Sequence, residues 1–197
     1  MSLTRLVMSS LDERIERASR EPVCIVPYDP HWPELFRCER DHLRACLPGQ
    51  LLGRIEHFGS TAVPGLAAKP IVDILVEVSD LEATKGQIVP VLEGQGYEYF
   101  WRPTTSVGDG LPFYAWFIKR GSDRARSHHI HMVEPHFPHW DGLFVRDYLM
   151  AHPEVAQDYL RLKLSLAAAH PNDREAYTDG KTEFIASIMP RARAESL

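Results

Sequence analysis

Residues 55–78 read IEHFGSTAVPGLAAKPIVDILVEV. This stretch predicts a strand that breaks at Gly59-Ser60, a loop rich in proline and glycine, and a second strand that carries one carboxylate, Asp73. Glycine lets the main chain approach an anion closely, and the Ser60 hydroxyl and neighbouring N–H groups can donate to that anion. An acid on the next strand can hold the divalent cation that accompanies a polyphosphate. The stretch therefore predicts a phosphate and metal site beside a sheet.

The Gly59-Ser60 break matches neither of two common loops for phosphates and nucleophiles. A P-loop needs glycine, four residues and then Gly-Lys-Ser/Thr, whereas Lys69 lies four residues beyond Gly65. A nucleophile elbow needs Gly-x-Ser-x-Gly, and Ser60 lacks both glycines. The remaining alternatives are a simple tight turn, and a strand-end Asp73 that is satisfied by backbone N–H groups. Lys69 is expected at the mouth of the loop or paired with Asp73.

The length, composition and net charge of the chain limit the classes of protein to which it can belong. The chain has 197 residues, 44% of them hydrophobic, with a formal net charge of −5. This fits one domain, or a core with a small appendage. The acidic balance disfavours broad binding of DNA or RNA, which needs a basic face. Three cysteines without metal-ligand spacing, no signal peptide and no long apolar run predict a cytoplasmic protein that does not enter the membrane.

The pattern of apolar residues predicts a mixed α/β region followed by helices. Strands are expected over residues 23–26, 51–58, 71–78, 98–102, 113–119 and 128–133, and helices over residues 33–47, 81–92, 140–151, 153–169 and 174–189. The prediction is an α+β fold: a mixed β-sheet core with flanking helices and a C-terminal helical segment. We expect a helical arm over residues 1–20, an α/β core over residues 21–139, and a helical cap over residues 140–197 with a cleft between cap and core.

Histidines on a later strand extend the predicted site. His129 and His131 share one strand face, because side chains alternate, and imidazoles at this spacing can ligate one ion, contact phosphate or act as acid and base. The alternative is two half-buried histidines that are merely hydrogen-bonded. Glu77 shares the strand face of Asp73 but lies roughly 13 Å along it. His57, at the end of the preceding strand, is expected to face the same site.

The predicted C-terminal helices repeat a spacing of tyrosine and lysine. Tyr159 and Lys163 are four residues apart, as are Tyr177 and Lys181, and residues at this spacing share one face of a helix. A nucleotide base can stack on the tyrosine ring, while the neighbouring lysine ammonium group binds phosphate. Arg146 offers a guanidinium that can bind phosphate through two N–H groups. The alternative is core tyrosines beside solvated lysines.

Together these residues resemble the GrpB family of the nucleotidyltransferase superfamily. The likeness runs in order from about residue 23 to residue 188. The motifs that carry it are Val26-Pro27-Tyr28-Asp29-Pro30-His31-Trp32-Pro33, Glu56-His57, Gly59-Ser60-Thr61, Lys69-Pro70-Ile71-Val72-Asp73-Ile74, His129-Ile130-His131, Arg146-Asp147-Tyr148-Leu149, Ala151-His152-Pro153, Tyr159 with Lys163, and Tyr177 with Lys181. The superfamily normally places a second acid two residues after the first, and here that position is Leu75. Because two-metal chemistry needs close carboxylates, Leu75 argues against ordinary two-metal catalysis.

The resemblance implies binding of a nucleoside triphosphate or similar phosphorylated small molecule with Mg²⁺ or Mn²⁺, with Zn²⁺ as an alternative, and nucleotidyl transfer to an unidentified acceptor. The residues expected to bind the nucleotide and its phosphates are Gly59, Ser60, Thr61, Lys69, Arg146, Tyr159, Lys163, Tyr177 and Lys181. The residues expected to hold the metal are Asp73, Glu77 and His131. The expected catalytic residues are Asp73, His129 and His131.

Two other hypotheses stand beside this one. GrpB-like domains occur fused to dephospho-CoA kinase in some bacteria, so the chain can be a non-catalytic folding or regulatory module, which Leu75 favours. Retention of Asp73 and the His-x-His strand indicates that such a module still binds a ligand. The third hypothesis treats residues 127–133 as a degenerate histidine triad with His129 as covalent nucleophile. It has only two of three alternating histidines and leaves the Gly-Ser loop unexplained. The sequence does not decide the oligomeric state.

Overall fold

The computed structural model describes residues 11–103 and 113–196, which contain a five-stranded mixed sheet. The strands are β1 (Leu52–Phe58), β2 (Val72–Val78), β3 (Glu98–Pro103), β4 (Phe113–Arg120) and β5 (Arg126–Val133). Their spatial order is β1-β2-β5-β4-β3. The central pair β2 and β5 is parallel, and the other neighbouring pairs are antiparallel.

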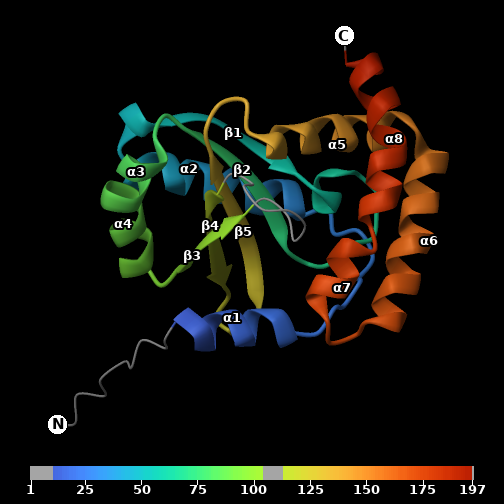
Figure 1. Ribbon diagram of the computed structural model, residues 1–197, viewed down its shortest axis with the longest axis horizontal. Helices are drawn as coiled ribbons and strands as arrows, with labels where there is room; N and C mark the ends of the chain where they lie inside the picture. Colours follow the sequence, from blue (N-terminus) through green and yellow to red (C-terminus); the bar gives the residue numbers. More distant parts are fainter. Residues whose placement is uncertain (1–10, 104–112, 197) are drawn as a thin grey trace.

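Helices surround this sheet. They are α1 (Leu11–Arg20), α2 (Trp32–Cys46), α3 (Leu81–Ala83), α4 (Val89–Gly94), α5 (Asp141–Ala151), α6 (Pro153–Ala169), α7 (Arg174–Asp179) and α8 (Thr182–Glu195). Figure 1 shows α3 and α4 at one side of the sheet and α6, α7 and α8 together at the other. The predicted α+β fold with a mixed sheet, flanking helices and a C-terminal helical segment is confirmed. No helix of residues 11–103 or 113–196 is both long and apolar enough to cross a membrane.

The alternation of side chains along β2 divides the core between the two faces of the sheet. Ile74 and Val76 are fully buried on one face, in a cluster with Leu43 of α2 and Leu92 of α4. Leu75 is fully buried on the other face, in a cluster with aromatic side chains such as Trp116. Asp73 shares the face of Leu75, because the two are two residues apart. The candidate site therefore belongs to the face opposite α2 and α4.

A third apolar cluster joins the C-terminal helices to the loop between β1 and β2. Val63 and Leu66 of the loop are buried against Tyr148 of α5, Tyr159 of α6 and Ile188 of α8. The loop that begins at the Gly59-Ser60 turn is thus packed between the sheet and the C-terminal helices. This packing fixes the loop relative to both.

Several predicted elements differ from the structure. The strand expected over residues 23–26 is wrong, since this segment forms only a bridge between Val26 and Ala68. The helix expected over residues 81–92 is divided by a π turn, Thr84–Ile88. Pro90 follows this turn in the first turn of α4, where its missing N–H is tolerated.

The helix expected over residues 174–189 is also divided. The chain turns at Gly180 between α7 and α8, and a Cβ on Gly180 would lie 2.4 Å from the Leu166 side chain of α6. A side chain at position 180 would require the Leu166 side chain to move. At its other end α8 continues through Pro190 to Glu195.

The first ten residues of the predicted N-terminal arm lie outside the described residues. The remainder forms α1, and Ala18 of α1 is buried in the cluster on the Leu75 face of the sheet. The proposed division into arm, core and cap stays a prediction.

Candidate functional site

The parallel pairing of β2 and β5 brings together residues that are far apart in the sequence. Asp73 lies directly opposite His129, and Leu75 lies opposite His131. The His129 Nδ1 atom is 3.1 Å from Asp73 Oδ1, and His131 Nε2 is 4.0 Å from the same oxygen. Each of the three side chains offers a ligand atom, and these atoms lie within 4.8 Å of one another. We call Asp73, His129 and His131 the Asp73 cluster.

The Gly59-Ser60 turn lies against Asp73. Phe58 pairs with Asp73 across the antiparallel β1–β2 ladder, and Gly59 follows with a φ of 71°. A Cβ on Gly59 would lie 2.8 Å from Asp73 Oδ2, so glycine is required here for both its conformation and its size. The turn continues as a 3₁₀ helix, Ser60–Ala62. The predicted approach of the turn to the acid is therefore present.

The hydroxyl groups of the turn already have partners within the protein. The Ser60 side chain hydrogen-bonds to Tyr159 of α6. The Thr61 hydroxyl lies 3.0 Å from His57 Nε2, and Thr61 is almost fully buried. Burial lowers the pKa of His57 to about 4, although the Asp73 charge opposes this shift. His57 is therefore neutral at physiological pH and positions the turn through Thr61.

Lys69, Lys163 and Lys181, which we call the lysine group, lie around two tyrosine rings. The Nζ atoms of Lys69 and Lys181 are 5.1 and 4.8 Å from the centre of the Tyr177 ring. Lys163 Nζ lies 5.0 Å from the centre of the Tyr159 ring and donates a 2.5 Å hydrogen bond to the Ala67 carbonyl. These are cation–π distances. The structure thus brings the two predicted tyrosine–lysine pairs and Lys69 together.

Electrostatics link the lysine group to Asp73. Burial lowers the pKa of Lys163 to about 7, and the nearby charge of Lys181 lowers it further. Burial also lowers the pKa of Lys69 and of Lys181, and in both lysines the Asp73 charge acts in the opposite direction. Among the described residues, no carboxylate forms an ion pair with Lys69 or Lys163. Burial therefore disfavours the ammonium form of Lys69 and Lys163 unless an anion compensates it.

Asp73 is ionised and its neighbouring imidazoles are neutral. Burial raises the pKa of Asp73, but the His129 hydrogen bond and the nearby charges outweigh this effect and hold the pKa at about 2. Burial lowers the pKa of His129 to about 4 and that of His131 well below its usual value. The Asp73 side chain is 29% exposed, so a small ligand can reach it.

Two arginines near the site were missed by the sequence analysis. Arg174 of α7 donates to the backbone carbonyls of Glu21 and Pro22, at 3.0 and 3.1 Å, while its Nη1 atom is buried without a partner in the described part of the chain. Arg126 of β5 places Nη1 3.3 Å from His129 Nε2. The position of Arg174 three residues before Tyr177, about one helical turn, is a signal that could have identified it.

Two predicted site residues lie elsewhere. Arg146 of α5 donates to the His57 carbonyl at 2.8 Å and also contacts Glu56 and Asp147, so its guanidinium holds α5 against β1. Glu77 forms a 3.0 Å ion pair with Arg54 at the far end of β2. Glu77 is not in the group of ligand atoms around Asp73.

The Asp73 cluster can hold a divalent cation. It presents one carboxylate and two neutral imidazoles, a set of oxygen and nitrogen donors that suits Zn²⁺ or Mn²⁺, whereas Mg²⁺ prefers oxygen and would depend on Asp73. The His131 Nδ1 atom is buried and has no hydrogen-bond partner among the described residues. The His131 Nε2 atom, 4.0 Å from Asp73 Oδ1, is the ring nitrogen that lies near the ionised acid.

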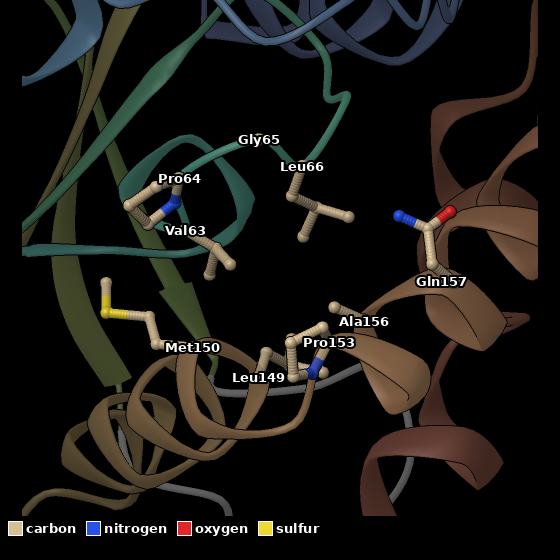
Figure 2. Close-up of a pocket in the computed structure, with 9 residues that line it drawn as sticks. All are labelled: Val63, Pro64, Gly65, Leu66, Leu149, Met150, Pro153, Ala156 and Gln157. Atoms are coloured by element: carbon tan, nitrogen blue, oxygen red, sulfur yellow. The ribbon is translucent and has the colours of Figure 1, made fainter.

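Two cavities in the structure lie away from the Asp73 cluster. One, of about 250 Å³, lies between the loop after β1 and the adjoining ends of α5 and α6, and Figure 2 shows its mainly apolar lining, which includes Val63, Leu66, Leu149 and Met150. The other, of about 420 Å³, lies around Trp140, with Arg54 and Arg193 in its wall. Neither is lined by a predicted site residue, and the chemistry of the side chains identifies the candidate site instead.

The comparisons with known proteins agree on one family. The model of the family described as GrpB protein matches residues 22–191. UPF0157 protein PA4798 of Pseudomonas aeruginosa is 39% identical over 187 residues, which cover 92% of this chain and 72% of that protein. A dephospho-CoA kinase of Mycolicibacterium paratuberculosis is 30% identical over 207 residues, which cover 95% of this chain and half (50%) of the kinase. The crystal structure of conserved protein GrpB from Enterococcus faecalis matches with a TM-score of 0.73 at 34% identity, covering 88% of this chain and 99% of that one.

Proposed function

The chain belongs to the GrpB family, and we propose that it binds a nucleoside triphosphate or a similar phosphorylated small molecule together with a divalent cation. The observation that carries the proposal is the lysine group beside Asp73. Lys69 and Lys181 lie over Tyr177, and burial depresses the pKa of both lysines. A cytoplasmic location is part of the proposal, and the free thiols of Cys24, Cys38 and Cys46 are consistent with a reducing compartment.

The charge balance of the site favours a polyanion. Buried ammonium groups are unfavourable unless a partner compensates their lost hydration. The Asp73 charge acts on the pKa of Lys69, Lys181 and Arg174, and the charge of Lys181 acts on that of Lys163. A ligand with several negative charges, such as a di- or triphosphate, would compensate these groups. Arg174 Nη1, which lacks a partner among the described residues, would donate to the same anion.

The cation would be held within the Asp73 cluster by Asp73 and His131. Asp73 supplies the charge that a divalent ion needs, and His131 supplies an imidazole. A bound ion would neutralise and orient phosphate oxygens. The lysine group would bind the oxygens on the other side of the phosphate chain, as electrostatic stabilisation of phosphoryl chemistry requires.

A second candidate function is a non-catalytic binding module. Leu75 occupies the position where the superfamily carries its second acid, and it is fully buried among apolar side chains. Leu75 cannot ligate a second ion. The match to half of a dephospho-CoA kinase also favours a module that binds a phosphorylated ligand without transferring a group.

The test of binding is a thermal-shift and calorimetric panel of nucleotides and coenzyme A precursors, each with Mg²⁺, Mn²⁺ or Zn²⁺. A ligand of the native state raises its apparent stability by mass action. Because Lys163 is almost fully buried, methionine is the substitution that preserves its volume. We expect the Lys163→Met, Lys181→Met double variant to stay folded and to lose at least about tenfold in nucleotide affinity, or about 1.4 kcal/mol.

The matched control is Arg161→Met on the same helix, α6, where the arginine points outward and is 71% exposed. It should bind like the wild type. Equal affinity of the double variant and the wild type at low salt would show that the lysine group is structural.

Pyrophosphate release separates the two candidate functions. A nucleotidyltransferase releases pyrophosphate from a nucleoside triphosphate when an acceptor or water attacks the α-phosphorus, and Asp73→Asn should abolish that release. Tight nucleotide binding without pyrophosphate release, in the presence of each cation, would support the non-catalytic module.

A further inference from the structure

We propose that His129 is a positioning residue rather than a metal ligand: Arg126 fixes its ring as the Nδ1–H tautomer, which donates to Asp73 and leaves the cation to Asp73 and His131. The tautomer follows from the contacts of the ring alone. The assignment of the cation rests on the proposed function.

The argument begins with the donors around the imidazole. Arg126 Nη1 lies 3.3 Å from His129 Nε2, and a guanidinium has N–H groups but no acceptor. The Nε2 atom must therefore accept this hydrogen bond. A neutral imidazole then carries its proton on Nδ1, which lies 3.1 Å from Asp73 Oδ1 and donates to it. In the other tautomer the proton would lie on Nε2 and oppose an N–H group of Arg126. The Nδ1 lone pair would then face the Asp73 carboxylate.

Both ring nitrogens of His129 are thus occupied. Nδ1 holds a proton, and the lone pair of Nε2 points to Arg126, so neither atom is free to bind a cation. His131 differs in this respect. Its Nδ1 atom has no hydrogen-bond partner among the described residues, and its Nε2 atom lies 4.0 Å from Asp73 Oδ1.

Arg126 is itself held firmly. It is 7% exposed, its Nε donates to the Glu21 carboxylate at 2.5 Å, and its Nη2 donates to the Ala18 carbonyl at the end of α1. These contacts fix the guanidinium from outside the site. The contacts from Arg126 to His129 and from His129 to Asp73 therefore connect α1 and the segment after it to the Asp73 carboxylate.

These contacts also orient the carboxylate. His129 binds Oδ1, while Oδ2 faces the Gly59 turn, where a Cβ would lie 2.8 Å from it. Hydrogen bonds of this kind from a second layer of residues orient a ligating carboxylate. Asp73 thus presents its other oxygen toward the turn.

The first test is the tautomer of His129 in the cation-free protein. Long-range ¹H–¹⁵N spectra of the histidine rings report which nitrogen is protonated, and the His129→Asn variant identifies the signal of residue 129. We expect a protonated Nδ1 and an unprotonated Nε2. A proton on Nε2 would overturn the proposal. In Arg126→Met the Asp73 carboxylate still accepts from Nδ1–H, so the tautomer should persist, while the ¹⁵N shift of Nε2 should change because its hydrogen bond from Arg126 is lost.

The second test is calorimetric titration with Mn²⁺ and Zn²⁺ of His129→Asn and His131→Asn. An asparagine amide can replace the Nδ1–H donor to Asp73 but cannot replace an imidazole ligand. We expect His129→Asn to stay within about threefold of the wild-type affinity and His131→Asn to lose at least about tenfold. Equal losses in both variants would show that His129 ligates the ion. The spectra test the tautomer even where neither ion binds, so failure of the proposed function is distinguishable from failure of this inference.

Discussion

Asp73 and Glu39 are two carboxylates on opposite faces of the same sheet, and they are compensated in different ways. Glu39 of α2 is 2% exposed, accepts a 2.5 Å hydrogen bond from the Tyr97 hydroxyl and forms an ion pair with Lys119. One acid meets one cation there. Asp73 instead contacts His129 and His131, and its charge acts on Lys69 and Lys181.

The difference shows that burial alone does not mark a functional acid. Glu39 is the more buried of the two, yet its charge is balanced within the protein. Asp73 forms no ion pair with a lysine or arginine among the described residues, and two buried polar atoms near it, on His131 and Arg174, have no partner there. An unbalanced site of this kind is the one that an anionic ligand would complete.

Acidification should produce the largest loss of stability. Burial lowers the pKa of His57, His129 and His139 to about 4, from an ordinary value of 6.5. Between these values the unfolded chain binds more protons than the native protein, so stability is full above pH 6.5 and is lost as pH falls toward 4. Asp73, with a pKa of about 2, adds a loss only below its ordinary value of 3.8.

We therefore expect several kcal/mol of stability to disappear between pH 6.5 and 4.5, since each pKa unit corresponds to about 1.4 kcal/mol. Urea unfolding across this range measures it. His139→Phe should flatten the dependence. A stability that is constant from pH 7 to 4.5 would contradict the neutral state of His57, His129 and His139.

Substitution of Glu39 should have the next largest effect, and only on stability. Glu39→Gln removes the charge that balances Lys119 and weakens the bond to Tyr97, so we expect a loss of about 3 kcal/mol in the free energy of unfolding. Urea unfolding at pH 7.5 measures this loss. Nucleotide and cation affinity of the folded variant should equal those of the wild type. An altered affinity would mean that the two faces of the sheet are coupled.

Asp73→Asn should have the opposite effect, with a smaller loss of stability and a loss of cation binding. The depressed pKa of Asp73 predicts that loss of the charge costs about 2 kcal/mol of stability, so the variant stays folded. Calorimetric titration should show no binding of Mn²⁺ or Mg²⁺, because the amide keeps the shape of the side chain but lacks the charge that a hard cation needs. Unchanged affinity in the variant would remove Asp73 as a ligand.

Much of the fold could be predicted because its strands have clear patterns. The apolar run around Asp73 identifies a central strand, and alternation places His129 and His131 on one face. The parallel pairing that brings them to Asp73 depends on contacts between distant segments, which local patterns do not encode. The functional roles assigned to these residues stay predictions.

The parts that could not be predicted depend on long-range contacts. Tyr177 and Lys181 were expected on one helix face, but Gly180 ends α7 before Lys181, which precedes α8. The two residues meet across a turn instead, at 4.8 Å. Arg126 and Arg174 were missed because their partners are the carboxylate and backbone of the segment at Glu21, more than 100 residues earlier in the sequence.

The parallel ladder between β2 and β5 has a consequence for how the chain folds. Asp73 and His129 are separated by 56 residues, so α3, α4, β3 and β4 all lie within the loop that their pairing closes. Contacts between distant residues form slowly, because closing a long loop costs entropy before the contacts stabilise it. A ribosome must also release the chain beyond Lys181 before the lysine group is complete. The candidate site is therefore built from contacts between distant segments, and a ligand that binds there depends on the folded chain.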